Sequence, residues 1–240
     1  MKNQGNVVKT DRADGAETRR KLLDAAVTLF AEKGYHDTRT GEICGAARAN
    51  IAAVHYHFGS KADIYIAAWR HAFERSIAAY PPDGGVPPGA PAEERLRGHV
   101  RALVRRSRDP AGRDLDIAHR EMANPTGLLA DVMHQSLEPM RQMHLGIIRG
   151  ILGPEADEQD VDLCEMSIHA QCVVSLMHAR QRRLAPRDMR PPPPHLRGVD
   201  EAALTEHILR FSLAGLREVR KRAQGGRHGA TGKSRGGRTR

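Results

Sequence analysis

The sequence has few aromatic residues, which make up only 4% of its 240 positions. Alanine, leucine, arginine and glutamate are abundant instead, a composition that favours helices and offers little for a sheet-rich fold. Hydrophobic residues amount to 40% of the chain, which is enough to furnish a core. We therefore expect an all-α globular protein.

Cysteine is scarce as well, with three residues, no CxxC pair and thus no disulfide framework. No signal peptide and no apolar run long enough to span a bilayer is visible, so we expect a cytoplasmic protein without a membrane partner. Cys164 and Cys172 lie eight residues apart on one predicted helical face. Buried thiols are the preferred interpretation, and a redox sensor is the alternative.

Acidic residues are absent after Glu218, whereas eight basic residues follow it and account for eight of the nine net positive charges. The rest of the chain is close to neutral. Any sequence-specific contact to DNA must therefore come from the local placement of groups. The basic tail itself could add only nonspecific attraction to phosphate.

Apolar residues at three- and four-residue intervals predict a series of helices separated by glycine- and proline-rich breaks. We expect a flexible arm over 1–15, a disordered tail over 223–240, and a domain boundary in the connector "PPDGGVPPGAP" at 81–91. The N-terminal domain is predicted over 16–63, its last helix running on to about 79, and the C-terminal domain over 80–222. A stiff loop is expected at 191–194. Helices are predicted near 16–33, 40–46, 50–57, 61–79, 91–108, 112–123, 126–152, 157–184 and 200–222.

The second and third predicted helices are short and are joined by a tight turn, the pattern of a helix-turn-helix. Small residues at 46, 47, 49 and 52 are placed where the two helices would cross. Asn50 can cap the third helix, whose eight residues span about 12 Å and suit a major groove roughly 12 Å wide. The spacing predicts that Ile43, Ile51, Val54 and Phe58 point inward.

Polar and small side chains remain for contacts with DNA. Thr38, Asn50 and Tyr56, together with Lys61, are placed to bind phosphates, while Ala52, Ala53 and His55 are left for base edges, where an imidazole can donate to guanine. Two histidines two residues apart on a helix diverge, so no metal site is expected. The full set of predicted DNA-contacting residues is Thr38, Thr40, Asn50, Ile51, Ala52, Ala53, His55, Tyr56, His57 and Lys61.

The motifs "LLDAAVTLFAEKGY" (22–35), "TRTGEI" (38–43) and "VHYHFGSK" (54–61) resemble the DNA-binding domain of the TetR/AcrR family of transcriptional regulators. Further along, "REMANPT", "CEMSIHAQC" and "HILRFSLAGL" resemble the subgroup of CecR-type regulators. The resemblance implies a homodimer that binds a palindromic double-stranded DNA operator and is released by a small-molecule effector, without a cofactor. One departure is Arg48, where family members usually carry glycine, and a positive φ there would be strained.

The C-terminal domain is rich in histidine and methionine, which suit a ligand cavity but also ordinary core packing. Arg120 and Glu121 could orient an effector or hold two helices together. Amphipathic faces over 160–183 and 201–219 would form the dimer. The predicted effector-binding residues are His119, Arg120, Glu121, Met122, His134, Met140, His144, Gln171 and Cys172.

Two other functions compete with the regulator. A helical enzyme could use His119, Glu121 and Cys172, but the sequence has no phosphate loop, zinc-protease motif or nucleophile elbow, so we expect no catalysis. A DNA-compacting protein could rely on the basic tail alone, and it would have no operator preference.

Overall fold

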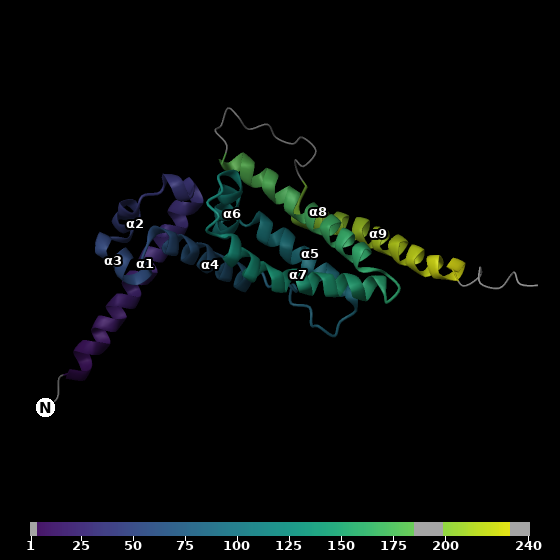
Figure 1. Cartoon of the computed structure of the whole chain (residues 1–240), viewed down its shortest axis with the longest axis horizontal. Helices are drawn as coiled ribbons and strands as arrows, with labels where there is room; N and C mark the ends of the chain where they lie inside the picture. Colours follow the sequence, from purple (N-terminus) through teal and green to yellow (C-terminus); the bar gives the residue numbers. More distant parts are fainter. Residues whose placement is uncertain (1–3, 185–198, 231–240) are drawn as a thin grey trace, which may run out of the picture. The chain divides into compact units, whose positions relative to one another are not determined.

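The computed structural model describes residues 4–184 and 199–230, and all regular elements of this part of the chain are helices. The predicted all-α fold is confirmed. The helices in chain order are α1 (Gln4–Asp37), α2 (Thr40–Ala47), α3 (Ile51–Phe58), α4 (Lys61–Ala79), α5 (Ala92–Arg108), α6 (Arg113–Ala123), α7 (Ala130–Leu152), α8 (Glu158–Leu184) and α9 (Glu201–Ala230) (Figure 1).

The described residues form two compact units. The first unit comprises the described residues of 1–79 and 110–135, and the second comprises those of 80–109 and 136–240. The chain thus leaves the first unit after α4 and returns to it with α6 and the first residues of α7. We expect 110–135 in the C-terminal domain, and in the structure the α6 part of this segment packs on α1 and α4.

The core of the first unit is built from the apolar faces of α1, α2, α3, α4 and α6. Its fully buried side chains include Leu22, Phe30, Ile43, Val54, Ile64, Tyr65 and Ile117. The regular part of α1 stops at Gly34, whose φ of 80° is open to glycine without steric cost. The short turn that follows brings Tyr35 to within 5.0 Å of the Tyr65 ring, measured between centroids.

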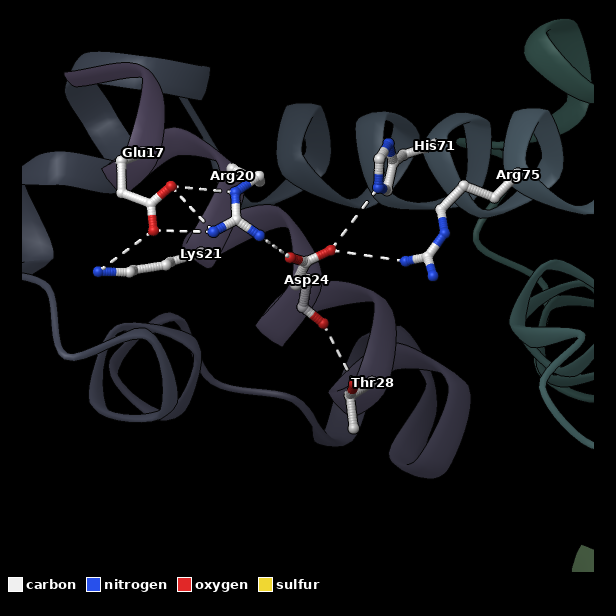
Figure 2. A network of polar contacts seen from close by, with 7 residues as sticks. All are labelled: Glu17, Arg20, Lys21, Asp24, Thr28, His71 and Arg75. Atoms are coloured by element: carbon white, nitrogen blue, oxygen red, sulfur yellow. Dashed lines mark hydrogen bonds and ion pairs between the residues drawn. The ribbon is translucent and has the colours of Figure 1, made fainter. Parts of the chain in front are cut away.

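A surface network also joins α1 to α4 (Figure 2). Asp24 of α1 accepts a hydrogen bond from Arg20 at 3.4 Å, and its other carboxylate oxygen lies 3.6 Å from His71 Nε2 and 3.8 Å from Arg75 Nη1, both on α4. These groups are substantially exposed, so each pair is worth only a fraction of a kcal/mol, up to about 1 kcal/mol. The two helices are therefore held together mainly by the buried apolar side chains between them.

The second unit is a helical bundle in which α5 contacts α8 and α9, and α8 contacts α9. Its core is aliphatic, with Leu96, Val100, Ile148, Ile168, Ile208 and Leu209 among the buried residues. The connector packs directly on α5, since a Cβ added to Gly84 would lie 2.2 Å from the Gly98 carbonyl oxygen. His99 Nδ1 lies 2.8 Å from the Pro82 carbonyl oxygen, which fixes the same approach.

Two predicted boundaries differ from the structure. The helix expected from about 16 begins at Gln4, within the segment expected to be a flexible arm, and α9 continues through Ala230 instead of ending near 222. Both extensions prolong an existing helix, which avoids the cost of nucleating a new one. The stiff loop expected at 191–194 lies outside the described residues. Within the described part of the chain, no helix combines the length and apolar character needed to cross a bilayer.

Candidate nucleic-acid interface

Helix α2 is held in place by a buried apolar side chain and by a capping residue of its own first turn. Ile43 is fully buried in the first unit. Glu42 accepts a hydrogen bond from the Arg39 backbone N–H at 2.9 Å and from Lys33 Nζ at 2.6 Å. These contacts lower the pKa of the Glu42 carboxyl, with the Lys33 hydrogen bond as the largest cause. Glu42 therefore caps the start of α2.

The turn between α2 and α3 is closed at Arg48, which has a left-handed conformation with φ 53° and ψ 41°. Its N–H donates to Gly45 O at 3.2 Å, and the Ala49 N–H donates to Cys44 O at 2.9 Å. This is the positive φ expected for a position that usually carries glycine. An arginine here costs roughly 1–2 kcal/mol relative to an unstrained conformation.

Helix α3 begins as predicted, because Asn50 caps it by accepting a hydrogen bond from the Ala52 N–H at 3.0 Å. Val54 is fully buried and Phe58 is partly buried. Ile51 is 55% exposed, so the prediction that it points inward is wrong. The helix is only two turns long, and Val54 alone is fully buried at its base.

The outer face of α3 carries small and polar side chains. Tyr56 is 85% exposed, and Ala52 and His55 are exposed as well. Ala53 and His57 are partly covered, and the His57 ring lies edge-on to both Tyr56 and Phe58. Arg19 of α1 lies over the Phe58 ring at 4.9 Å from its centroid, which supports the end of the helix.

One ring nitrogen of His55, Nδ1, is used in a hydrogen bond to the backbone. Its Nδ1 lies 2.8 Å from the Gly59 carbonyl oxygen, which can only accept, so Nδ1 must carry the proton and donate. In the neutral ring the outward Nε2 is then an acceptor. A neutral His55 would match a base donor, such as the amino group of adenine or cytosine, whereas a protonated ring would donate to guanine as predicted.

Lys61 stands at the start of α4 next to α3. Its ammonium group lies over the Tyr35 ring, 4.3 Å from the centroid, and desolvation lowers its pKa while Asp37 opposes that shift. Ser60 caps the start of α4, since the Asp63 N–H donates to Ser60 Oγ at 3.2 Å. The Ser60 hydroxyl, in turn, donates to the Asp63 carboxylate at 2.6 Å.

Two threonines were expected in the interface with DNA. Thr40 is partly buried at the first residue of α2. Thr38 is fully buried, and its hydroxyl donates to the Gly34 carbonyl oxygen at 2.7 Å. Thr38 therefore closes the end of α1, and we remove it from the set of DNA-contacting residues.

The nine predicted effector-binding residues do not gather in one unit. His119, Arg120, Glu121, Met122 and His134 belong to the first unit, whereas Met140, His144, Gln171 and Cys172 belong to the second. In the first unit, Met122 and His134 are exposed on the surface of α6 and α7. The nine residues are thus two separate groups.

Arg120 and Glu121 hold helices together and do not pair with each other. Arg120 donates to the Glu32 carbonyl oxygen near the end of α1. Glu121 accepts from the Tyr65 hydroxyl of α4 at 2.9 Å and from the Thr126 and Gly127 N–H groups at 2.9 and 3.0 Å. Burial, and then Glu121, raise the pKa of Tyr65, so its hydroxyl stays a donor. No local pattern points to Tyr65, because its partner lies 56 residues away in the chain.

A buried pair of histidines lies inside the second unit. The rings of His99 and His144 are 4.4 Å apart between centroids, and both residues are almost fully buried. Burial, followed by the nearby His99 and His169, lowers the pKa of His144 to about 3. Its Nδ1 lies 3.6 Å from Glu165, but a neutral ring forms no ion pair there, and its Nε2 has no hydrogen-bond partner among the described residues.

The cysteines show no sign of reactivity. Burial raises the pKa of Cys172 to about 12, and burial together with Asp160 raises that of Cys164. Both remain thiols near neutral pH, and the thiolate is the form that attacks or oxidises readily. This agrees with the expectation of packing thiols.

Comparisons with known proteins agree with this geometry. Residues 22–68 match the family model "Bacterial regulatory proteins, tetR family", and residues 92–216, more than half of the chain, match "HTH-type transcriptional dual regulator CecR, C-terminal domain". The regulator AcrR of Shigella flexneri is 33% identical over 63 residues, which is 26% of this chain and 29% of AcrR. The negative regulator IcaR of Staphylococcus aureus is 44% identical over 45 residues, 19% of this chain and 24% of IcaR. These relatives are therefore matched over less than a third of their length.

Solved structures are similar over most of the chain. The fatty acid degradation regulator FadR from Bacillus halodurans has a TM-score of 0.60 at 18% identity, covering 83% of this chain and 96% of FadR. A TetR-like regulator from Rhodococcus sp. RHA1 has a TM-score of 0.58 at 18% identity, covering 83% and 95%. At this identity the likeness establishes the fold. Together with the two family models, it places this chain in the TetR family of DNA-binding transcriptional regulators, with a C-terminal domain of the CecR type.

Proposed function

We propose that the chain is a ligand-responsive repressor that binds a palindromic operator as a homodimer and leaves it when a small molecule binds. The observation that carries the proposal is the exposed face of α3, where small and polar side chains surround a helix fixed by the Asn50 cap and the buried Val54. The name of the relative IcaR, a negative regulator, supports repression as the direction of control.

The roles on the interface follow from exposure and chemistry. Tyr56 offers an exposed hydroxyl, and Asn50 and Lys61 flank the two ends of α3, so these three would bind phosphates and set the register. Ala52 and Ala53 would meet thymine methyl groups, and His55 would accept from a base amino group through Nε2. Thr40, Ile51 and His57 remain proposed contacts at the rim.

Exposed apolar residues support dimerisation through α8 and α9, the segments expected from 160–183 and 201–219. The three large apolar side chains that the described part of the second unit exposes are Leu163, Met166 and Phe211, and all lie on these helices. Covering them against a second copy would pair the same surfaces across a twofold axis and form a four-helix interface.

The second unit is the proposed site of the effector. Its apolar interior contains polar side chains, among them the buried His144 and the part-buried Gln171, whose Nε2 lies 3.4 Å from Ser212 Oγ. Met140 and Cys172 belong to the same unit and stay in the proposed set. His119, Arg120, Glu121, Met122 and His134 lie in the first unit, where Arg120 and Glu121 already bond to groups of α1 and α4, and their effector role stays a prediction. Effector binding would favour a conformation whose two reading helices no longer match half-sites about 34–36 Å apart.

The test is selection of bound fragments from a pool of random double-stranded DNA by the full chain. We expect a palindromic motif to be enriched, and deletion of residues 231–240 should leave that motif unchanged. Tyr56→Phe with Lys61→Ala should weaken binding to all sequences, while changes at Ala53 or His55 should alter the preferred base. A pool without an enriched motif would instead favour the DNA-compacting alternative.

The enzyme hypothesis gains no support from two of its three residues, Glu121 and Cys172. Both carboxylate oxygens of Glu121 accept hydrogen bonds from within the first unit, and Cys172 stays protonated. Glu121 is thus occupied as an acceptor and Cys172 is a thiol, which does not favour a general base or an activated nucleophile at these positions.

A further inference from the structure

Arg48 combines an unfavourable backbone conformation with a position beside the proposed reading helix. It is the one non-glycine residue with a positive φ in the described part of the chain. Its turn is fixed by hydrogen bonds to the carbonyl groups of Cys44 and Gly45, so the conformation is imposed on whichever residue stands there. Strained residues that persist are concentrated at sites of binding and catalysis.

The guanidinium of Arg48 is exposed and has no hydrogen bond, ion pair or ring contact among the described residues. Residues 37–63 contain three carboxylates, and each has a different neighbour: Glu42 binds Lys33, Asp63 accepts from Ser60, and Asp37 attracts Lys61. The strain at Arg48 is therefore not offset by a contact of its side chain within the first unit.

The charges of residues 37–63 also set Arg48 apart from the other basic residues of this segment. The same segment contains three basic residues, Arg39, Arg48 and Lys61, against its three acids, so it is formally neutral. Arg39 lies near Glu42 and Lys61 near Asp37, which leaves Arg48 as the cation of the segment without a facing carboxylate. It stands two residues before Asn50, the cap at the end of the helix that a helix-turn-helix inserts into the groove.

We propose that Arg48 is a DNA-backbone contact, in which its guanidinium binds a phosphate beside each half-site. Arginine suits this role because its planar group donates two parallel hydrogen bonds to a phosphate and keeps its charge at all physiological pH values. The contact would position the turn on the duplex without reading sequence. This inference rests on the proposed function, because it requires DNA binding through α3.

The experiment compares the full chain with Arg48→Gly, Arg48→Lys and, as a matched control, Arg70→Ala. Arg70 is an exposed arginine of the same unit, nine residues and roughly 13 Å along α4 from Lys61. Affinity for the selected operator is measured at several salt concentrations, and thermal unfolding is measured in parallel.

We expect Arg48→Gly to raise the melting temperature by about 2–4 °C as the strain is relieved, and yet to weaken operator binding about tenfold per subunit. The slope of log K against log salt should fall by about 1 per subunit, with the preferred motif unchanged. Arg48→Lys should keep most of the slope, and Arg70→Ala should change neither affinity nor slope.

A stabilised Arg48→Gly variant that retains the affinity and salt slope of the natural chain would overturn the proposal and leave the proposed function intact. A natural chain that binds no operator would instead overturn both. The stability measurement ensures that weaker binding by Arg48→Gly cannot be attributed to a poorly folded variant.

Discussion

At the scale of single residues, burial changes the acid-base chemistry of His144. It lies in an aliphatic core next to His99 and His169, and its pKa of about 3 is far below the ordinary value of 6.5. Between these two values the unfolded chain binds a proton at this position and the folded chain does not. Acid therefore favours unfolding. The free energy of unfolding is highest above pH 6.5, where His144 is neutral in both states, and it falls as the pH drops toward 3.

Replacing His144 with leucine should reduce this acid sensitivity. For a pKa gap of this size, moving from pH 7 to pH 5 costs the natural chain about 2 kcal/mol of unfolding free energy at this site. Leucine removes the proton-binding group and fills a similar volume, so His144→Leu should lose about that much less over the same interval. Denaturant midpoints at both pH values provide the measurement.

The matched control is His134→Leu, the same substitution at an exposed histidine of the first unit. It should leave the pH dependence unchanged. If His144→Leu loses as much stability between pH 7 and pH 5 as the natural chain does, the imidazole of His144 is not the group that resists protonation.

At the scale of elements, α6 is held by α4 through a part-buried hydrogen bond and by α1 through an exposed one. Tyr65→Phe removes the hydroxyl that donates to Glu121 and leaves the ring in place. A hydrogen bond to a charged group contributes about 1.5–3 kcal/mol, so the first unit should lose that much unfolding free energy. Chemical denaturation followed by a probe in the first unit would measure the loss.

Tyr56→Phe is the appropriate comparison, since that hydroxyl is exposed and has no partner among the described residues. It should leave stability unchanged while weakening DNA binding. Equal stability losses in the two variants would mean that the bond between Tyr65 and Glu121 contributes nothing specific.

The same contrast explains which elements could be predicted from the sequence. The start of α3 is specified by neighbouring residues, because the Asn50 cap acts over two positions. The attachment of α6 depends on Tyr65 and Glu121. Because these residues are far apart in the chain, no local sequence pattern predicts their contact. Thr38 illustrates the same limit: a hydroxyl suited to a phosphate is also suited to the carbonyl oxygen of Gly34, and only packing decides between them.

At the scale of the whole molecule, the proposed repressor needs one copy of the chain on each half-site of its operator. The two units divide this work, since the first carries the α3 face and the second exposes the apolar residues of α8 and α9. A dimer formed by the second unit would fix the spacing of two reading helices, so operator affinity should depend on residues that never contact DNA.

Phe211→Glu tests this dependence directly. Phe211 is 66% exposed, and in a symmetric dimer its replacement places two carboxylates in an apolar interface. Aromatic anchors at the centre of an interface typically contribute 2 kcal/mol or more, so we expect the dimer dissociation constant to rise by a factor of at least about 30. Sedimentation should then report a monomer at micromolar concentration, and operator affinity should fall with it. Met122→Glu introduces the same charge at an exposed apolar residue of the first unit and should leave the dimer intact; a Phe211→Glu chain that remains dimeric would place the interface elsewhere.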